Sequence, residues 1–165
     1  MYKILRSFLF LFSPEWVHYF SMNCLRLLCS IVPIRKLLKY SFKPAQTVPY
    51  SLFDIQFINK VGLGAGFDKN AKYLRELECL GFGFVEIGTV TPLPQAGNDK
   101  PRLFRLPKDR ALINRMGFNN DGVKVITERI KKFKIQNSKS NVIIGGNIGK
   151  NKVTSNEDAW KDYDI

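Results

Sequence analysis

Three short segments combine small and polar residues in a way that suits ligand binding. In segment 64–69, Gly-Ala-Gly-Phe-Asp-Lys, the small residues let the backbone approach a flat or phosphorylated ligand, and Lys69 offers a cation. Thr89 can offer a hydroxyl to the same ligand, and the amide of Asn147 presents a donor and an acceptor to the edge of a heterocycle. Each group also has a structural interpretation, as turn glycines, a strand-end threonine and a turn asparagine.

A fourth candidate lies in the connection 92–119, because connections of this length tend to be functional. Its last part places Asn114, Arg115 and Asn119 among apolar residues, which is typical of a lid that buries a small polar substrate against apolar walls. The run that begins at Asn119 can also serve as the cap of a following helix. For the single histidine, His18, we expect a structural or surface role, because no metal-binding partner is spaced for it.

The elements that must position these groups alternate along the chain. Short apolar runs predict strands, and apolar residues at three- and four-residue steps predict helices. Buried strands are expected at 61–64, 84–88 and 141–146, helices at 70–80, at 122–133 and from Asn156 onwards, and smaller extended segments at 51–57 (a hairpin or edge strand) and 102–106. This order indicates an α/β chain with parallel strands, in which the ligand-binding loops follow the carboxyl ends of the strands.

Residues 1–43 differ from the region that follows, 44–165. The tripeptide 13–15, Ser-Pro-Glu, predicts a helix start, and apolar side chains then recur at helical spacing. After an interrupting proline, a second short helix is expected over 34–40, followed by a linker at 43–45. The N-terminal region is therefore predicted to be helical and separate from the α/β region.

Charge and aromatic residues are concentrated in the same N-terminal region. The sequence has 26 basic and 14 acidic side chains, a net charge of +12, and 45% hydrophobic residues, which excludes a disordered chain. Half of the excess, seven basic residues against one acid, falls within the first 50 residues together with ten aromatic residues. This mixture favours helices that lie in a membrane interface and meet anionic lipid. Ordinary amphipathic helices packed on a domain are the alternative, and nucleic-acid binding is disfavoured because no recognised motif supports it.

The apolar runs, the N-terminus and the cysteines indicate where in the cell the protein is expected. The N-terminal apolar runs are too short, or too interrupted by polar residues, for a transmembrane span of about 20 mostly apolar residues. A signal peptide is not indicated, since no small-residue cleavage site follows the basic start. The three cysteines have no CxxC or zinc-type spacing, and their odd number favours a reducing intracellular compartment.

Several long segments together resemble one family, the quinone-dependent (class 2) dihydroorotate dehydrogenases. The matching segments are 62–70, 81–92, 94–106, 113–120 and 147–152, and the N-terminal helix pair with its Pro14-Glu15 start is similar as well. The resemblance runs through essentially the whole chain. It implies a (β/α)8 TIM barrel that holds FMN at the carboxyl ends of its strands. It also implies oxidation of dihydroorotate to orotate in pyrimidine synthesis, with a membrane quinone as the electron acceptor.

The same resemblance implies roles for individual residues. FMN would be held by Ala65, Gly66, Phe67, Asp68, Lys69, Thr89 and Asn147, and dihydroorotate or orotate by Lys69, Asn114, Arg115, Met116, Gly117 and Phe118. Lys69 suits the substrate carboxylate or charge that develops on the reduced flavin, and Asn114 suits the amide groups of the substrate ring. No metal and no nucleic acid are expected. The N-terminal helices would bind an anionic membrane surface at the quinone entry, as a peripheral protein on the cytoplasmic face of the inner membrane.

The sequence departs from the family pattern in its length. A complete barrel usually takes about 250 residues, so we expect that the chain is truncated after three strand–helix units. The family's catalytic base is a serine in a later loop, which we expect beyond Ile165, and no serine of this chain is assigned that role. We therefore expect part of a binding site without turnover. The alternative is a non-catalytic truncated remnant held at the membrane.

Overall fold

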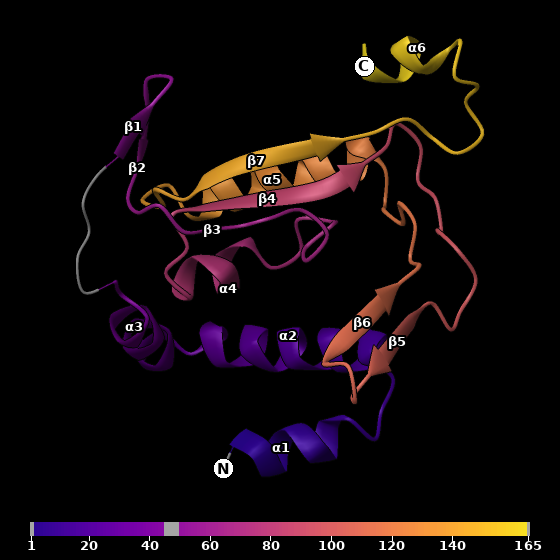
Figure 1. The fold of residues 1–165 in the computed structure, drawn as a ribbon. Coiled ribbons are helices and arrows are strands. Elements are labelled where there is room, and N and C mark those ends of the chain that lie inside the picture. The colour runs from indigo at the N-terminus through magenta and orange to yellow at the C-terminus, as the bar shows by residue number, and fades with distance from the viewer. Residues whose placement is uncertain (1, 45–49, 165) are drawn as a thin grey trace.

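A small parallel sheet lies above the N-terminal helices in the computed structural model, which describes residues 2–44 and 50–164 (Figure 1). The helices are α1 (Tyr2–Leu9), α2 (Pro14–Ser30), α3 (Val32–Ser41), α4 (Leu74–Cys79), α5 (Val123–Gln136) and α6 (Ala159–Tyr163). The strands are β1 (Tyr50–Leu52), β2 (Ile55–Phe57), β3 (Gly62–Leu63), β4 (Phe84–Val90), β5 (Leu103–Leu106), β6 (Ala111–Asn114) and β7 (Ile143–Ile148). Strands and helices alternate from β3 to α6 apart from the inserted β5 and β6, which confirms the predicted α/β class.

The central sheet consists of β3, β4 and β7 in that order, and all three strands run parallel. Leu63 of β3 pairs with Val85 of β4, and Val85 pairs on its other side with Ile144 of β7. Because neighbouring side chains in a strand point to opposite faces, the buried Val85 and Ile87 share one face of the sheet. Parallel strands end at the same edge, so the segments after β3, β4 and β7 meet there.

One hydrophobic core joins the sheet to helices from both parts of the chain. Leu77 of α4, Ile126 of α5 and Val85 of β4 are buried in this core, and Met22 brings α2 into it. Burying a side chain of this size stabilises a fold by about 1.5–3 kcal/mol. Helix α2 is therefore packed on the α/β region through the same core that holds the sheet.

Helix α4 begins at Leu74, four residues later than the sequence predicted. The two carboxylate oxygens of Asp68 accept backbone N–H groups, from Lys72 at 2.9 Å and from Tyr73 at 2.7 Å. Ala71 has a φ of 52°, in the left-handed region that a right-handed helix excludes. These turns delay the helix, and the apolar spacing of the sequence does not reveal them.

The strand boundaries also differ from the prediction. Strands β4 and β7 each end two residues later than expected, because Val90 still pairs with Ile148 beyond an irregularity in the register. Thr89 and Asn147 consequently lie within the two strands and not in the predicted loops. Strand β3 has two residues and is half-buried rather than buried, since it lies at the edge of the sheet with β4 as its pairing partner.

Helix α2 starts where the sequence predicted. The backbone N–H of Trp16 donates to Oγ of Ser13 at 3.3 Å, and Pro14 occupies the first turn. Helix α3 starts at Val32, two residues earlier than expected, because Pro33 fits the first turn of a helix, where its missing N–H has no intrahelical acceptor. The predicted linker at 43–45 lies partly outside the described residues.

Two antiparallel hairpins complete the chain. Strands β1 and β2 form the hairpin expected at 51–57. Strands β5 and β6 form a second hairpin in which Leu103 pairs with Asn114. Only β5 was predicted, and the β6 segment was interpreted as lid, because its exposed residues show no alternation of apolar and polar types. Helix α6 begins three residues later than expected, after a turn in which the N–H of Asp158 donates to Oγ of Ser155.

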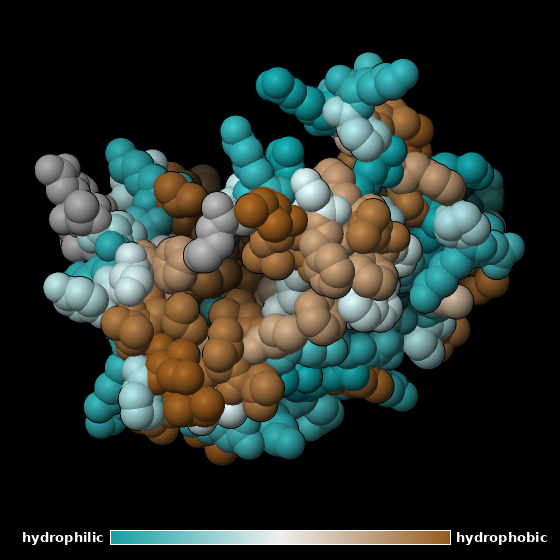
Figure 2. Space-filling model, turned by 90° about the horizontal axis from the view of Figure 1, so that it is seen from below, coloured by the Kyte–Doolittle hydropathy of each residue, from teal (hydrophilic) through white to brown (hydrophobic). Residues whose placement is uncertain are grey.

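The N-terminal helices expose many apolar side chains. Figure 2 shows them gathered on the face seen from below, the side on which α1, α2 and α3 lie in Figure 1. One example on each helix is Ile4, Leu27 and Leu37, whose exposed fractions are 77%, 68% and 63%. Among the described residues, no single helix has the length and apolar character needed to cross a membrane. Helices α2 and α3 meet these limits only as a pair, which is bent by 112°.

Candidate functional site

The segments after the three parallel strands meet at one edge of the sheet, as the sequence predicted. The backbone N–H of Gly66 donates to the carbonyl of Gly88 at 2.9 Å, which ties the segment 64–69 to β4. The hydroxyl of Thr89 donates to Oδ1 of Asn147 at 2.6 Å, although the two residues are 58 positions apart in the sequence. The candidate residues from all three strands therefore lie close together.

Glu86 also belongs to this group, although its role was not predicted from the sequence. Its Oε1 accepts the side-chain amide of Asn147 at 3.4 Å, and its Oε2 accepts the backbone N–H of Ala65 at 3.4 Å. Because the nitrogen of the Asn147 amide faces Glu86, its oxygen faces the Thr89 hydroxyl, so the orientation of the amide is determined. A glutamate that alternates with apolar residues is common in half-buried strands, so its type and spacing alone do not mark it as a site residue.

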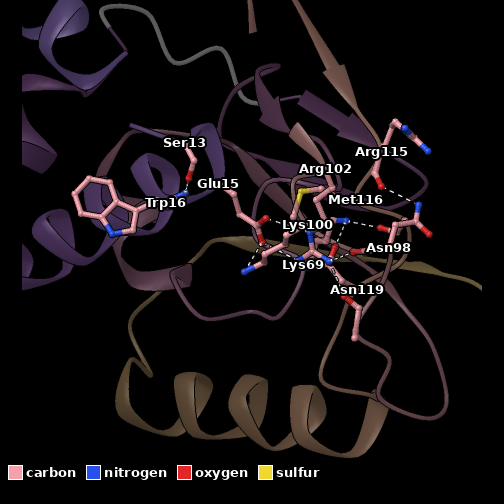
Figure 3. A network of polar contacts seen from close by, with 12 residues as sticks. Ser13, Glu15, Trp16, Lys69, Asn98, Lys100, Arg102, Arg115, Met116 and Asn119 are labelled. Carbon is pink, nitrogen blue, oxygen red and sulfur yellow. Dashed lines mark hydrogen bonds and ion pairs between the residues drawn. The ribbon is translucent and has the colours of Figure 1, made fainter. Parts of the chain in front are cut away.

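Lys69 reaches from the segment after β3 to the end of the long connection (Figure 3). Its Nζ donates to the carbonyl of Gly117 at 2.7 Å and to Oδ1 of Asn119 at 2.7 Å. Burial lowers the pKa of Lys69, and the positive charge of Arg102 acts in the same direction. An ammonium group has three donors, and these two bonds leave one of them for a ligand.

The predicted substrate residues Asn114, Arg115 and Met116 are placed differently from one another. Asn114 lies at the end of β6, where its Oδ1 accepts the N–H of Met116 at 3.0 Å, and both residues line a cavity that also contains Lys69. Arg115 lies beside them in the chain, but its side chain points away from this network in Figure 3. Its backbone carbonyl accepts the amide of Asn98 at 2.8 Å. The structure therefore gathers Asn114 and Met116 at the cavity but not the guanidinium of Arg115.

The last two predicted substrate residues lie nearer to the sheet edge. Gly117 contacts Lys69 through its carbonyl, as described above. A Cβ at Gly149 would lie 2.7 Å from Cγ2 of Thr89 and 3.5 Å from a ring carbon of Phe118. The absence of a side chain at Gly149 thus allows Phe118 to approach Thr89 across it.

A cavity of about 240 Å³ lies between Lys69 and helix α2. The ring of His18 packs edge-on against the ring of Phe67, with 4.7 Å between the ring centroids. Burial lowers the pKa of His18, although the negative charge of Asp68 opposes this effect. The single histidine is therefore part of the cavity wall. From the N-terminal helix the cavity is lined by Pro14, Glu15, His18 and Tyr19, and from the α/β region by Gly66, Phe67, Asp68, Lys69, Asn114 and Met116, among others.

Asp68 uses its carboxylate within the chain. The residue is 3% exposed, and both of its oxygens accept backbone N–H groups just before α4. Burial raises the pKa of Asp68, and these hydrogen bonds oppose the rise. The side chain thus organises the turn that follows the glycine-rich segment, and its position beside the cavity follows from that turn.

An ion pair between Glu15 and Arg102 joins α2 to the long connection (Figure 3). Nε and Nη2 of Arg102 donate to the two carboxylate oxygens of Glu15 at 3.1 and 2.7 Å. Nη1 of Arg102 donates to the carbonyls of Ala96 at 2.7 Å and Asn98 at 2.9 Å. The exposed fractions of the two side chains are 8% for Arg102 and 13% for Glu15. Hydrogen bonds from Arg102 hold the pKa of Glu15 below its ordinary value.

This pairing could not be predicted from the sequence, because the two residues are 87 positions apart and each has many oppositely charged alternatives. Glu15 was noticed only as an acid in the first turn of a helix, and Arg102 only as part of an extended segment. The tertiary structure brings Arg102 to Glu15, which lines the cavity.

Comparison with known proteins identifies the family. A family model described as "Dihydroorotate dehydrogenase" matches residues 48–163, which is more than half of the chain. The chain belongs to the dihydroorotate dehydrogenase family. This assignment confirms the resemblance inferred from the sequence.

Similar proteins carry the name of the quinone-dependent type. The chain is 54% identical over 165 residues to the dihydroorotate dehydrogenase (quinone) of Christiangramia forsetii, covering 99% of this chain and 47% of the relative. It is 50% identical over 164 residues to the protein of the same name from Coxiella burnetii strain Dugway 5J108-111, covering 44% of that relative. The chain therefore spans about half the length of the curated relatives it matches.

Solved structures of the family share the fold. The crystal structure of DHODH from Eimeria tenella in complex with ferulenol matches with a TM-score of 0.71 and 38% identity, over 92% of this chain and 39% of that chain. The ligand-free structure from the same organism matches with a TM-score of 0.64 and 42% identity, over 77% of this chain and 38% of that chain. The α/β arrangement described here is thus that of part of a dihydroorotate dehydrogenase.

Proposed function

We propose that this chain provides the first flavin- and substrate-binding strands of a (β/α)8 quinone-dependent dihydroorotate dehydrogenase. The reaction would be the oxidation of dihydroorotate to orotate in pyrimidine synthesis, with a membrane quinone as electron acceptor. One observation carries the proposal: Lys69, in the segment that follows β3, makes two 2.7 Å hydrogen bonds to the segment that resembles the family's substrate loop. The relatives support the proposal through their family and their names. The chain covers about half of the length of these relatives.

The residues at the sheet edge fit FMN. A Cβ at Gly64, Gly66 or Gly146 would meet no atom within 4 Å, so a flat ring system can approach the backbone there. The hydroxyl of Thr89 and the amide of Asn147 supply the donors and acceptors that a heterocycle edge requires. Bound FMN would supply a two-electron acceptor. We assign Ala65, Gly66, Phe67, Asp68, Lys69, Thr89 and Asn147 to its binding, with Asp68 acting through the turn that it organises.

Substrate binding is assigned to Lys69 and to the segment from Asn114 to Phe118. The Lys69 ammonium would bind the carboxylate of the anionic substrate, because a partly buried cation binds an anion more strongly than an exposed one. The amide of Asn114 would pair with ring amide groups, and Met116 and Phe118 would exclude water. No serine of this chain is assigned as the proton acceptor. For the 165 residues alone we therefore propose neither stable FMN binding nor dihydroorotate oxidation.

The N-terminal region, 1–43, is proposed as the membrane-associating and quinone-entry part, and 44–165 as part of the barrel. The support is the exposed apolar face of α1, α2 and α3 together with the cavity that runs from α2 to Lys69. A protein of this kind would be peripheral on the cytoplasmic face of the inner membrane, attracted by anionic lipid.

The test is a chimera in which residues 1–165 replace the matching part of the Christiangramia forsetii protein, to which they are 54% identical. We expect a yellow protein with bound FMN that reduces a quinone analogue when dihydroorotate is added. The unaltered relative is the positive control. A chimera that folds, as judged by circular dichroism and gel filtration, but neither holds FMN nor oxidises dihydroorotate would contradict the proposal. If that chimera still bound vesicles, the non-catalytic membrane-bound alternative would be favoured.

A further inference from the structure

We propose that a basic groove between the N-terminal helices and helices α4 and α5 binds the phosphate groups of anionic membrane lipids. The groove has a volume of about 830 Å³, and none of its lining residues lines the cavity beside Lys69 except Lys72. The inference rests on the proposed membrane association but assigns it a specific site. The basic side chains of the groove are Arg26, Arg35, Lys72, Arg75, Arg129 and Lys132.

The charge of the groove is strongly unbalanced. Among the described residues that line it, six are basic and one, Glu76, is acidic. The Glu76 side chain is 3% exposed and lies 2.9 Å from Nη2 of Arg75, so it neutralises one cation within the wall. Asp121, outside the lining, lies 3.2 Å from Lys72 and 2.6 Å from Arg129. Like charges around a concave surface repel one another, and a bound anion relieves that repulsion.

Two of the arginines are held in place by the backbone. Nη2 of Arg26 donates to the carbonyl of Lys72 at 2.7 Å, and its guanidinium carbon lies 4.6 Å from the centre of the Tyr73 ring. Nη1 of Arg129 donates to the carbonyl of Asn70 at 3.1 Å and to Oδ2 of Asp121 at 2.6 Å. Each guanidinium has five donors, so most of them are left for a ligand. A fork that is already ordered loses little entropy when it binds a phosphate.

Arg35 and Lys132 lie on different helices of the groove and are less engaged with the fold. Nη1 of Arg35, on α3, donates to the carbonyl of Cys29 at the long distance of 3.4 Å. Lys132, on α5, is exposed. These two side chains are therefore the ones that can be replaced with the least effect on stability.

The position of the groove favours a lipid over a soluble anion. Arg26 and Leu27 lie on α2, Arg35 and Leu37 lie on α3, and both leucines are more than 60% exposed. Two of the helices that supply cations to the groove, α2 and α3, thus also supply exposed apolar side chains to the face that Figure 2 shows. A bilayer offers phosphate and hydrocarbon side by side, whereas inorganic phosphate or a nucleic acid offers only the charge.

The experiment compares two double variants in vesicle co-sedimentation. The groove variant is Arg35→Gln with Lys132→Gln. The matched control is Lys36→Gln with Lys134→Gln, which removes two cations from the same two helices at exposed positions outside the groove. Vesicles are either phosphatidylcholine alone or an equimolar mixture of phosphatidylcholine and phosphatidylglycerol.

We expect the unaltered chain to bind the mixed vesicles more tightly than phosphatidylcholine. The groove variant should lose about thirtyfold in binding to the mixed vesicles, and the control variant should keep most of it. A charge-keeping variant, Arg35→Lys with Lys132→Arg, should retain binding, and circular dichroism verifies that every variant is folded. An equal loss in the groove and control variants would overturn the proposal, because general surface charge would then explain the binding.

Two further outcomes separate this proposal from the membrane association on which it rests. If the unaltered chain binds both vesicles equally, the groove is not a lipid site, but the apolar face still binds membranes. If it binds neither vesicle, both proposals fail. Titration with inorganic phosphate and with a DNA oligonucleotide, without lipid, completes the test. Tight binding of either one, weakened only in the groove variant, would reassign the groove to a soluble anion or to nucleic acid.

Discussion

At the residue scale, Glu15 and Lys69 are charged side chains that are partly or largely buried beside polar partners. Glu15 is almost buried against Arg102, and Lys69 is half-buried against two oxygen atoms. A buried charge that loses its partner is costly, because no water replaces it. The two residues therefore lead to different predictions, one for stability and one for ligand binding.

Replacing Glu15 with Gln should lower the free energy of unfolding by about 3 kcal/mol at neutral pH, because the Arg102 guanidinium would stay buried without its counter-charge. The pKa of Glu15 is below its ordinary value in the folded chain. The pair therefore stabilises the fold above the ordinary glutamate pKa, and this contribution is lost as the pH falls through the lowered value. Urea unfolding at a series of pH values should show that acid-dependent loss in the unaltered chain and less of it in Glu15→Gln.

Glu128→Gln is the control for this measurement. Glu128 has a side chain that is 71% exposed and lies 2.9 Å from the Lys131 ammonium. The variant therefore removes the same charge from an ion pair that is exposed to solvent. An exposed pair of this kind contributes about 0–1 kcal/mol. Similar losses in Glu15→Gln and Glu128→Gln would show that the Arg102 pair does not hold α2 in place.

Lys69→Ala, made in the chimera, should lower kcat/KM for dihydroorotate by roughly 10- to 100-fold. The reason is the loss of a charged hydrogen bond to the substrate, which is worth about 1.5–3 kcal/mol. Steady-state kinetics with dihydroorotate varied at saturating quinone measures the effect. Lys108→Ala, at an exposed position in the turn of the β5–β6 hairpin, is the matched control and should leave kcat/KM unchanged. Unchanged kinetics in Lys69→Ala would remove this residue from the substrate site.

At the element scale, the packing of α2 on α4 decides how the N-terminal helices sit on the sheet. Cys29 of α2 and Cys79 of α4 are both fully buried, and Met22 of α2 enters the core. Burial raises the pKa of the Cys79 thiol to about 12, and it raises that of Cys29 as well. The reactivity of the cysteines therefore reports whether the two helices stay together.

Iodoacetamide at neutral pH should modify only Cys24 in the folded chain, because Cys24 is the exposed cysteine of the three. The thiolate is the reactive form, and the raised pKa lowers the thiolate fraction of Cys79 by roughly a thousandfold in addition to its lack of exposure. All three cysteines should react in denaturant. Mass spectrometry of tryptic peptides measures each site. Labelling of Cys29 at the rate of Cys24 under native conditions would mean that α2 is not docked on α4.

At the scale of the whole molecule, an apolar face on the N-terminal helices lies opposite the sheet (Figures 1 and 2). Exposed apolar side chains that occur singly are common in soluble proteins, but a contiguous group marks an interaction surface. Because α2 enters the core and α3 contacts both α2 and α4, the exposed apolar side chains of these two helices are held on one side of the molecule, where they can enter a membrane interface.

The triple variant Ile4→Ser, Leu27→Ser and Leu37→Ser should weaken partition into phosphatidylcholine vesicles by roughly tenfold for each substitution. Each side chain is more than 60% exposed, so its loss should change the free energy of unfolding little. Vesicle co-sedimentation measures partition. The control replaces three exposed apolar residues outside the N-terminal helices, Phe53, Ile135 and Val153, with Ser. Equal weakening by both triple variants would show that no particular face meets the membrane.

Local sequence determined much of the fold and the family. Helix α2 begins at the predicted cap because Ser13 and Pro14 act on neighbouring residues, and β4 and β7 follow from their apolar runs. The motifs around Lys69 and Asn114 suffice to show the family, because each is a contiguous set of residues. Such features depend on neighbours in the chain, so the sequence contains them directly.

Only the tertiary structure decided which distant residues meet. The bond from Thr89 to Asn147, the pairing of Glu15 with Arg102, and the placement of His18 against Phe67 join residues 49 to 87 positions apart. Their partners are chosen by the order of the strands and by the docking of α2, and many other pairings would satisfy the same charges and hydrogen bonds. For the same reason Arg115 could be assigned to a binding segment from the sequence, but the direction of its guanidinium, away from the site, could not be predicted.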